Sequence, residues 1–146
     1  LMETKGAIFR GSIRDNITSF GQHSEEYAKE VSALLKIDKE VQKFPSGFDT
    51  QLDGTSQDSL TPGLKQRIAI ARVLAAKPKL ILFDQADYGL DVDAYNSLFR
   101  LLGHLKGKAS MVLMTNDENI ASLADRHYRF EAGHIVPNPS YEGETL

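Results

Sequence analysis

The chain has 146 residues, a net charge of −3 and no cysteine. This length suits one domain with a real core, and 41% hydrophobic with 25% charged residues is ordinary for a soluble globular protein. The small negative charge gives no reason to expect nucleic-acid or membrane-surface binding. Disulfides are excluded, and no apolar run approaches the ~20 residues of a membrane span.

The first strong periodic pattern predicts a helix over residues 24–37. Ser24 is a suitable N-cap, and two glutamates in the first turn favour the helix dipole. The apolar positions that recur at helical spacing, and are expected to be buried, are Tyr27, Val31, Leu34 and Leu35. A second short helix is predicted over residues 41–44, ended by Pro45.

The central stretch, residues 60–91, has three parts in a fixed order. Thr61, Pro62 and Gly63 lead into a helical run over residues 65–76, which ends before Pro78. Residues 80–83, LILF, then form a continuous apolar run that ends on Asp84. Such a run predicts a strand buried on both faces, as in parallel sheets. A carboxylate at the C-terminal end of that strand lies where open α/β sheets bind ligands.

After this stretch, residues 92–106 predict an amphipathic helix ended by Gly107. Its apolar stripe, which is expected to face the core, comprises Tyr95, Leu98, Phe99, Leu101, Leu102 and Leu105. Residues 109–114 predict another buried strand, residues 115–123 a short capped helix, and residues 126–131 and 134–136 a terminal strand pair. Residues 137–146 are polar and are expected to form a loose tail.

Residues 60–91 resemble the second half of the nucleotide-binding domain of an ATP-binding cassette (ABC) transporter. That family carries a signature LSGGQ-x-QR-x-A-x-AR, a Walker B strand ending in Asp-Glu, and a D-loop of the type SALD. LTPGL at residues 60–64 stands for the LSGGQ part of the signature, and KQRIAIAR at residues 65–72 matches its remainder, x-QR-x-A-x-AR. Asp84 falls on the Walker B aspartate, Gln85 on the catalytic glutamate, and residues 88–91 on the D-loop.

The resemblance extends to both ends of the chain. IFRGSIRDNI at residues 8–17 is similar to the segment after the Q-loop of exporters, and residues 44–52 resemble the exporter pattern lP-x-GyDT-x-l. Thr4 then stands where the family has the Q-loop glutamine. That glutamine normally reaches the magnesium ion, whereas the shorter Thr4 would not reach as far. The alternative is that Thr4 is a strand end with no chemical role.

The resemblance implies an α/β fold: a partial P-loop NTPase (ABC ATPase) fold with a helical subdomain and the C-terminal strands and helices of the core sheet. Residues 1–136 would form the partial domain, with residues 11–76 as the helical subdomain and residues 77–136 as the Walker B, D-loop and switch part. Residues 137–146 would be the polar tail. No Walker A loop, G-x-x-x-x-G-K-[ST], occurs in the sequence, so we expect a fragment of such a domain.

In this family ATP lies between the Walker A side of one domain and the signature side of its partner. The signature helix presents free N–H groups to the γ-phosphate. The expected cofactor-binding positions are therefore Thr61, Pro62, Gly63, the Q-loop position Thr4 and the D-loop residue Asp91. However, Pro62 removes one N–H donor, and Leu64 replaces a polar glutamine. Asp84 can still take part in a Mg²⁺ site through water.

Two catalytic positions depart from ATPase chemistry. Gln85 is a neutral amide that cannot act as general base, a loss that costs about 10²–10⁴-fold in rate. Asn116 stands where the family has its switch histidine, and it cannot carry a positive charge. Together with Thr4 and Pro62, these residues indicate a degenerate site. The four histidines have no partner pattern, and the Asp84–Asp93 series lacks the spacing of a calcium loop.

We therefore expect an ATP-binding subunit fragment of an exporter-like membrane transporter with degenerate or absent ATP hydrolysis. One alternative is an interaction or regulatory module that kept the fold and lost nucleotide. Another is an active ATPase whose base comes from elsewhere. The expected partners are a transmembrane domain and a second nucleotide-binding domain, or a second copy through self-association, and no nucleic acid. The expected location is cytoplasmic, peripheral to the membrane through the transmembrane partner. ATP and Mg²⁺ would not be bound by this fragment alone.

Overall fold

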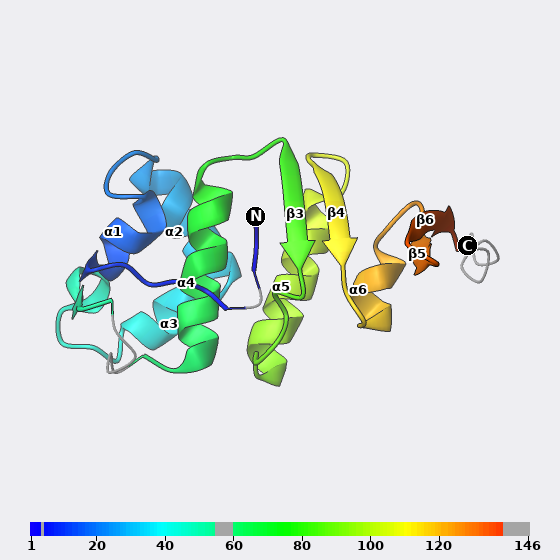
Figure 1. Cartoon of the computed structure of the whole chain (residues 1–146). Helices are drawn as coiled ribbons and strands as arrows, with labels where there is room; N and C mark the ends of the chain where they lie inside the picture. The colour runs from blue at the N-terminus through cyan, green and yellow to red at the C-terminus, as the bar shows by residue number, and fades with distance from the viewer. Residues whose placement is uncertain (4, 55–59, 139–146) are drawn as a thin grey trace.

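The computed structural model describes residues 1–3, 5–54 and 60–138, and its elements fall into a helical part and a strand-containing part (Figure 1). The helical part holds α1 (Ile13–Thr18), α2 (Glu25–Leu34), α3 (Ile37–Val41) and α4 (Pro62–Ala75). Near α1 lie the 3₁₀ turn η1 (Gly47–Asp49) and a two-stranded antiparallel pair, β1 (Gly11–Ser12) with β2 (Gln51–Leu52).

The strand-containing part follows α4. Its elements are β3 (Leu80–Asp84), α5 (Val92–Leu105), β4 (Ser110–Met114), α6 (Glu118–Ser122), β5 (Tyr128–Glu131) and β6 (His134–Pro137). The strands β3 and β4 are parallel, with Leu80 opposite Ser110 and Asp84 opposite Met114, and α5 is the crossover between them. The pair β5–β6 is an antiparallel hairpin at the far end of the molecule (Figure 1). The mixed α/β fold expected from the sequence is therefore confirmed.

The helix α4 forms the centre of the helical part because α1, α2 and α3 all pack against it. Its residues Leu64, Ile68, Ala71 and Leu74 are buried at helical spacing. The N-terminal segment runs between α4 and β3 in Figure 1. Met2 forms a parallel bridge with Phe83: its N–H donates to Leu82 O at 2.7 Å, and Asp84 N–H donates to Met2 O at 2.8 Å. This segment therefore lines the edge of β3 opposite β4.

The two parallel strands are buried on one face, and the prediction of strands buried on both faces is wrong. In β3, Phe83 is 1% exposed, whereas its neighbour Leu82 is 42% exposed. In β4, Val112 and Met114 are likewise exposed. The crossover helix α5 lies behind both strands in Figure 1 and covers the buried face. No element among the described residues covers the opposite face. The apolar side chains on that face are therefore exposed to solvent.

Two details of the helical part also differ from the sequence prediction. Leu34 is 51% exposed because α2 ends at that residue, and Lys36, at a φ of 55°, then turns the chain away. The short helix after this turn is Ile37–Val41, not residues 41–44. The predicted helix over residues 92–106 is confirmed: Asp91 caps α5, Leu98, Leu101 and Leu102 of its stripe are buried, and Gly107 follows with a φ of 78°. None of the described helices is long and apolar enough to cross a membrane.

Candidate functional site

The start of α4 is a well-formed helix N-terminus. Thr61 adopts an extended conformation, and its hydroxyl accepts a hydrogen bond from Leu64 N–H at 3.2 Å, while Pro62 occupies the first turn. Proline at this position suits helix initiation because the missing N–H has no partner within the helix. Thr61 and Pro62 are exposed, and Leu64 is buried in the core. The exposed start of α4 therefore offers fewer N–H donors to a ligand than a signature helix without proline.

The loop after β3 turns back at Gln85. Its backbone adopts a φ of 46°, its N–H donates to Met114 O at 2.9 Å, and its carbonyl accepts from Tyr88 N–H at 3.1 Å. A non-glycine residue in this region carries a strain of about 1–3 kcal/mol, which the flanking hydrogen bonds offset. The Gln85 side chain is exposed. The loop ends at Asp91, whose carboxylate accepts from Ala94 N–H at 2.8 Å and starts α5.

The start of α4 and the end of this loop lie side by side. A β carbon added to Gly63 would lie 3.9 Å from Gly89 O and 4.0 Å from Asp91 Oδ2. Three of the predicted cofactor contacts, Thr61, Gly63 and Asp91, are thus brought to one place from residues almost thirty positions apart. Gly63 has room for a methyl group within the fold, so close packing inside this chain does not by itself require glycine there.

The structure places the predicted catalytic positions at the carboxyl ends of the two parallel strands. Asp84 ends β3 and Gln85 follows it, while Asn116 comes two residues after the end of β4, with its side chain exposed. Asp84 is half-buried, and its N–H bonds to the N-terminal segment. Thr4, the predicted Q-loop position, lies outside the described residues.

A magnesium ion would need ligands beyond those of the protein. Within residues 1–3, 5–54 and 60–138, no three His, Asp or Glu side chains converge to hold a metal ion. The single Asp84 carboxylate fits a role through water, with phosphate oxygens as the other ligands. The carboxylate at the strand end is therefore the one candidate magnesium ligand that the sequence predicted.

A half-buried pair of carboxylates beside this edge was not anticipated from the sequence. The Asp117 carboxylate accepts from Ile120 N–H at 2.8 Å and from the Tyr95 hydroxyl at 2.7 Å, and these bonds lower the pKa of Asp117. Burial of Asp87, together with the charge of Asp117, raises the pKa of Asp87. One Asp87 oxygen is buried without a hydrogen-bond partner among the described residues. The cap role of Asp117 is readable in the sequence, but its pairing with Tyr95 is not.

The Asp87→Asn variant is expected to gain stability relative to the wild type as the pH rises. Because the folded-state pKa of Asp87 is raised, ionisation of this carboxyl disfavours the native state. Wild-type stability from this group is thus fully present below the unfolded-state pKa and lost as pH rises through the folded-state pKa. Urea unfolding at a series of pH values would measure the difference between variant and wild type. A difference that does not change between acid and neutral pH would contradict this assignment.

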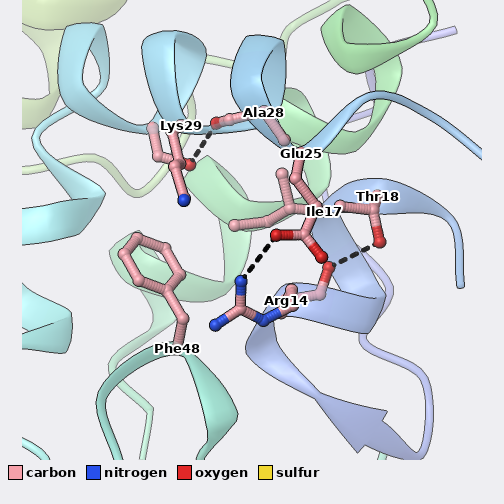
Figure 2. Close-up of a pocket in the computed structure, with 8 residues that line it drawn as sticks. Arg14, Ile17, Thr18, Glu25, Ala28, Lys29 and Phe48 are labelled. Atoms are coloured by element: carbon pink, nitrogen blue, oxygen red, sulfur yellow. Dashed lines mark hydrogen bonds and ion pairs between the residues drawn. The ribbon is translucent and has the colours of Figure 1, made fainter. Parts of the chain in front are cut away.

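One cavity lies apart from the candidate site, and an open cleft reaches that site at Asp91. Figure 2 shows a small cavity, of about 40 Å³, between α1, α2 and η1, where Arg14 pairs with Glu25 at 2.9 Å beside Phe48. It shares no residue with the predicted site. An open cleft of about 490 Å³ runs from α3 to Asp91. Its charges balance largely within the protein, since Lys36 lies 3.6 Å from Asp93 and Arg67 bonds to Glu40. Neither cavity is a convincing anion site.

Comparison with known proteins identifies the family. No family model matches the chain. The ABC multidrug transporter E of Aspergillus fumigatus is 33% identical over 140 residues, which is 92% of this chain and 11% of that protein. Multidrug resistance protein 1 of Plasmodium falciparum is 36% identical over 118 residues, 80% of this chain and 8% of that protein. The lipoprotein-releasing system ATP-binding protein LolD of Psychrobacter arcticus is 43% identical over 77 residues, 51% of this chain and 34% of that protein.

The chain spans about a tenth of the first two relatives and about a third of the third. The two longer matches cover most of this chain, and all three proteins are ABC transporters, multidrug resistance proteins or ATP-binding subunits by name. The motifs at residues 60–91 agree with this relationship. The chain therefore belongs to the ABC transporter family and corresponds to part of its ATP-binding domain.

Proposed function

We propose that this chain acts in an exporter-like ABC transporter by presenting its signature face and D-loop to an ATP held on the Walker A loop of a second domain. In this proposal, residues 11–76 are the helical subdomain, residues 77–136 carry the Walker B strand and D-loop, and residues 137–146 are a tail. The chain would work on the cytoplasmic side of the membrane, attached through a transmembrane partner. The observation that carries the proposal is the closeness of Gly63, buried just after the exposed Thr61 and Pro62, to Asp91.

The chemistry of a helix N-terminus supports this role. The positive end of the α4 dipole favours an anion, and Thr61 adds a hydroxyl. Gly63 is buried directly after the exposed Thr61 and Pro62, and Asp91 lies beside it on the D-loop. An ATP in this position would be shared with the second domain, whose Walker A loop would hold its phosphates. Mg²⁺ would arrive with the nucleotide and neutralise its charge.

The chain's own catalytic positions would not support hydrolysis in this role. The exposed amide of Gln85 is next to Asp84 at the strand end, where a carboxylate would orient and deprotonate water. Asn116 can donate a hydrogen bond but carries no charge. The role would therefore be structural or regulatory: completing and gating a site whose chemistry belongs to the partner.

The Gly63→Ala variant tests this proposal. The nearest atoms to the added methyl group lie at 3.9 and 4.0 Å, so the fold accepts it, and a helix gains up to about 1 kcal/mol when alanine replaces glycine. The added methyl group would, however, lie between the start of α4 and the D-loop, the two elements that we propose to contact the same phosphate. We expect unchanged or higher folding stability, together with at least a roughly tenfold weaker Mg-ATP-dependent association with a complete, hydrolysis-deficient exporter-type ATP-binding domain. Light scattering with and without Mg-ATP measures this association.

The matched control is Gly103→Ala in α5. That glycine also has room, with its nearest neighbour, Leu123, at 4.0 Å, but it lies far along the chain from the signature. We expect Gly103→Ala to leave ATP-dependent association unchanged. Association that does not depend on Mg-ATP in any variant would instead support the alternative, an interaction module that kept the ABC fold without using nucleotide.

A further inference from the structure

Gln66 is a buried amide in the second turn of α4, 4% exposed, whose side-chain hydrogen bonds all leave its own helix. Its Oε1 accepts from Gly6 N–H at 2.6 Å. Its Nε2 donates to Glu3 O at 2.7 Å and to Ala86 O at 2.9 Å. One side chain thus joins α4 to the N-terminal segment and to the loop after β3.

These contacts are specific to an amide. Two carbonyls require a donor and one N–H requires an acceptor, and of the side chains of this length only glutamine offers both at neutral pH. The carbonyl of Ala86 and the Gln66 amide meet in a buried setting, where an unsatisfied polar group costs about 1–3 kcal/mol. The contact therefore fixes both orientation and distance between α4 and the loop.

The N-terminal segment lies unusually close to α4 at the same place. A β carbon at Gly6 would lie 2.6 Å from the Ala69 side chain and 3.0 Å from Gln66 Oε1. Only glycine permits this approach, so the segment at Gly6 is pressed against the helix. Further along, Arg72 holds the same segment by donating to Ala7 O at 2.9 Å.

We infer that Gln66 is a positioning residue that keeps the start of α4 and the loop at residues 85–91 in one fixed arrangement. The loop begins and ends in the strand-containing part, whereas α4 belongs to the helical part. The bond from Gln66 to Ala86 crosses between these parts one turn from Gly63, which lies against Gly89 and Asp91. Gln66 thereby holds the signature face and the D-loop in a fixed position relative to each other. Its functional meaning, a joint contact to one ATP, rests on the proposed function.

Spin-label distances test the positioning role directly. The chain has no cysteine, so Tyr88→Cys on the exposed loop and Ala76→Cys on the exposed end of α4 provide the only two labels. In the otherwise wild-type chain we expect a single narrow distance distribution. Gln66→Leu fills the space but removes all three bonds, and we expect it to broaden or split the distribution. The exposed Gln42→Leu is the matched control and is expected to leave it narrow.

A merely structural role would not produce this result, because a loss of overall stability changes the folded fraction and not the distances within folded molecules. Amide exchange adds a second readout that needs only the folded protein. We expect protection of the Gly6 amide to fall about tenfold more in Gln66→Leu than global unfolding explains. Gln66→Glu keeps an acceptor for Gly6 N–H but no donor for Ala86 O, so we expect Gly6 protection to persist while the label distances broaden.

An unchanged narrow distribution in both Gln66→Leu and Gln66→Glu would overturn the inference. Neither readout involves ATP, so this failure is separate from that of the proposed function. If Gln66→Leu broadens the label distances and also weakens Mg-ATP-dependent association, both the positioning role of Gln66 and the proposed function are supported. If the label distances broaden in Gln66→Leu but the wild-type chain associates equally well without Mg-ATP, the positioning role of Gln66 is supported and the proposed function is wrong.

Discussion

Replacing Arg67 with methionine is expected to lower the free energy of unfolding by about 3 kcal/mol. The Arg67 side chain is 3% exposed, and its guanidinium donates to Gly63 O at 3.3 Å, to Leu35 O at 3.1 Å and to the Glu40 carboxylate. Methionine keeps the apolar stem but removes all of these side-chain hydrogen bonds. The carbonyl of Leu35 lies just beyond the end of α2, where a cation also stabilises the helix dipole. Urea unfolding of both proteins measures the change.

The matched control is Arg14→Met. Arg14 also bonds to two carboxylates, Glu25 and Asp49, at 2.9 and 3.0 Å, but its side chain is 35% exposed. Ion pairs in contact with solvent contribute only about 0–1 kcal/mol, because water solvates the partners when the pair is broken. Equal losses of unfolding free energy from both substitutions would mean that hydrogen bonds to buried carbonyls do not explain the contribution of Arg67 to stability. That result would contradict the account of α4 as the centre of the helical part.

Replacing Phe83 with alanine is expected to lower the free energy of unfolding by about 3–5 kcal/mol. Phe83 is among the largest fully buried side chains and belongs to the core cluster that also contains Leu98 and Leu102 of α5. Truncation removes most of its apolar contacts and leaves a cavity that the rigid strand fills poorly. Thermal or urea unfolding gives the loss directly.

Leu82→Ala in the same strand provides the comparison. Leu82 points to the face of β3 that no described element covers, so truncation there is expected to cost less than about 1 kcal/mol. A cost similar to that of Phe83→Ala would show that the second face is buried in solution. That result would agree with the sequence prediction of a strand buried on both faces, and would indicate self-association across this face.

The sequence was most informative where local chemistry decides the structure. Ser24, predicted as an N-cap, accepts a hydrogen bond from Tyr27 N–H, and Thr61 and Pro62 start α4 where the sequence placed them; these effects depend only on neighbours within four positions. The stripe of α5 was also predicted correctly, because helical spacing alone places Leu98, Leu101 and Leu102 on one face.

Features that depend on distant packing were not predictable in the same way. A run such as LILF is equally apolar whether one or two faces are covered, and β3 is covered on one. The spacing of Leu34 fits the buried stripe of α2, but the turn at Lys36 leaves it exposed. In both cases the outcome depends on which element packs opposite, and a local pattern does not contain that information.

The candidate site also contains features that the local sequence predicts and features that depend on distant packing. Its strand-end positions, Asp84, Gln85 and Asn116, were identified from motif order, and adjacent parallel strands then bring them to one edge. Gln66 was matched to the signature remainder at residues 65–72, but that match does not predict its contacts. Its partners lie 63, 60 and 20 positions away, and no periodic pattern links them.

The most direct test of the shared-site proposal is a calorimetric titration of the 146-residue chain with Mg-ATP. In that proposal the signature face and the D-loop belong to this chain, and the phosphate loop belongs to a second domain. We therefore expect no saturable heat at ATP concentrations up to about 1 mM, where a weak site would still register. Clear saturation in the micromolar range would mean that these residues hold the β- and γ-phosphates by themselves, and the shared-site proposal would be wrong.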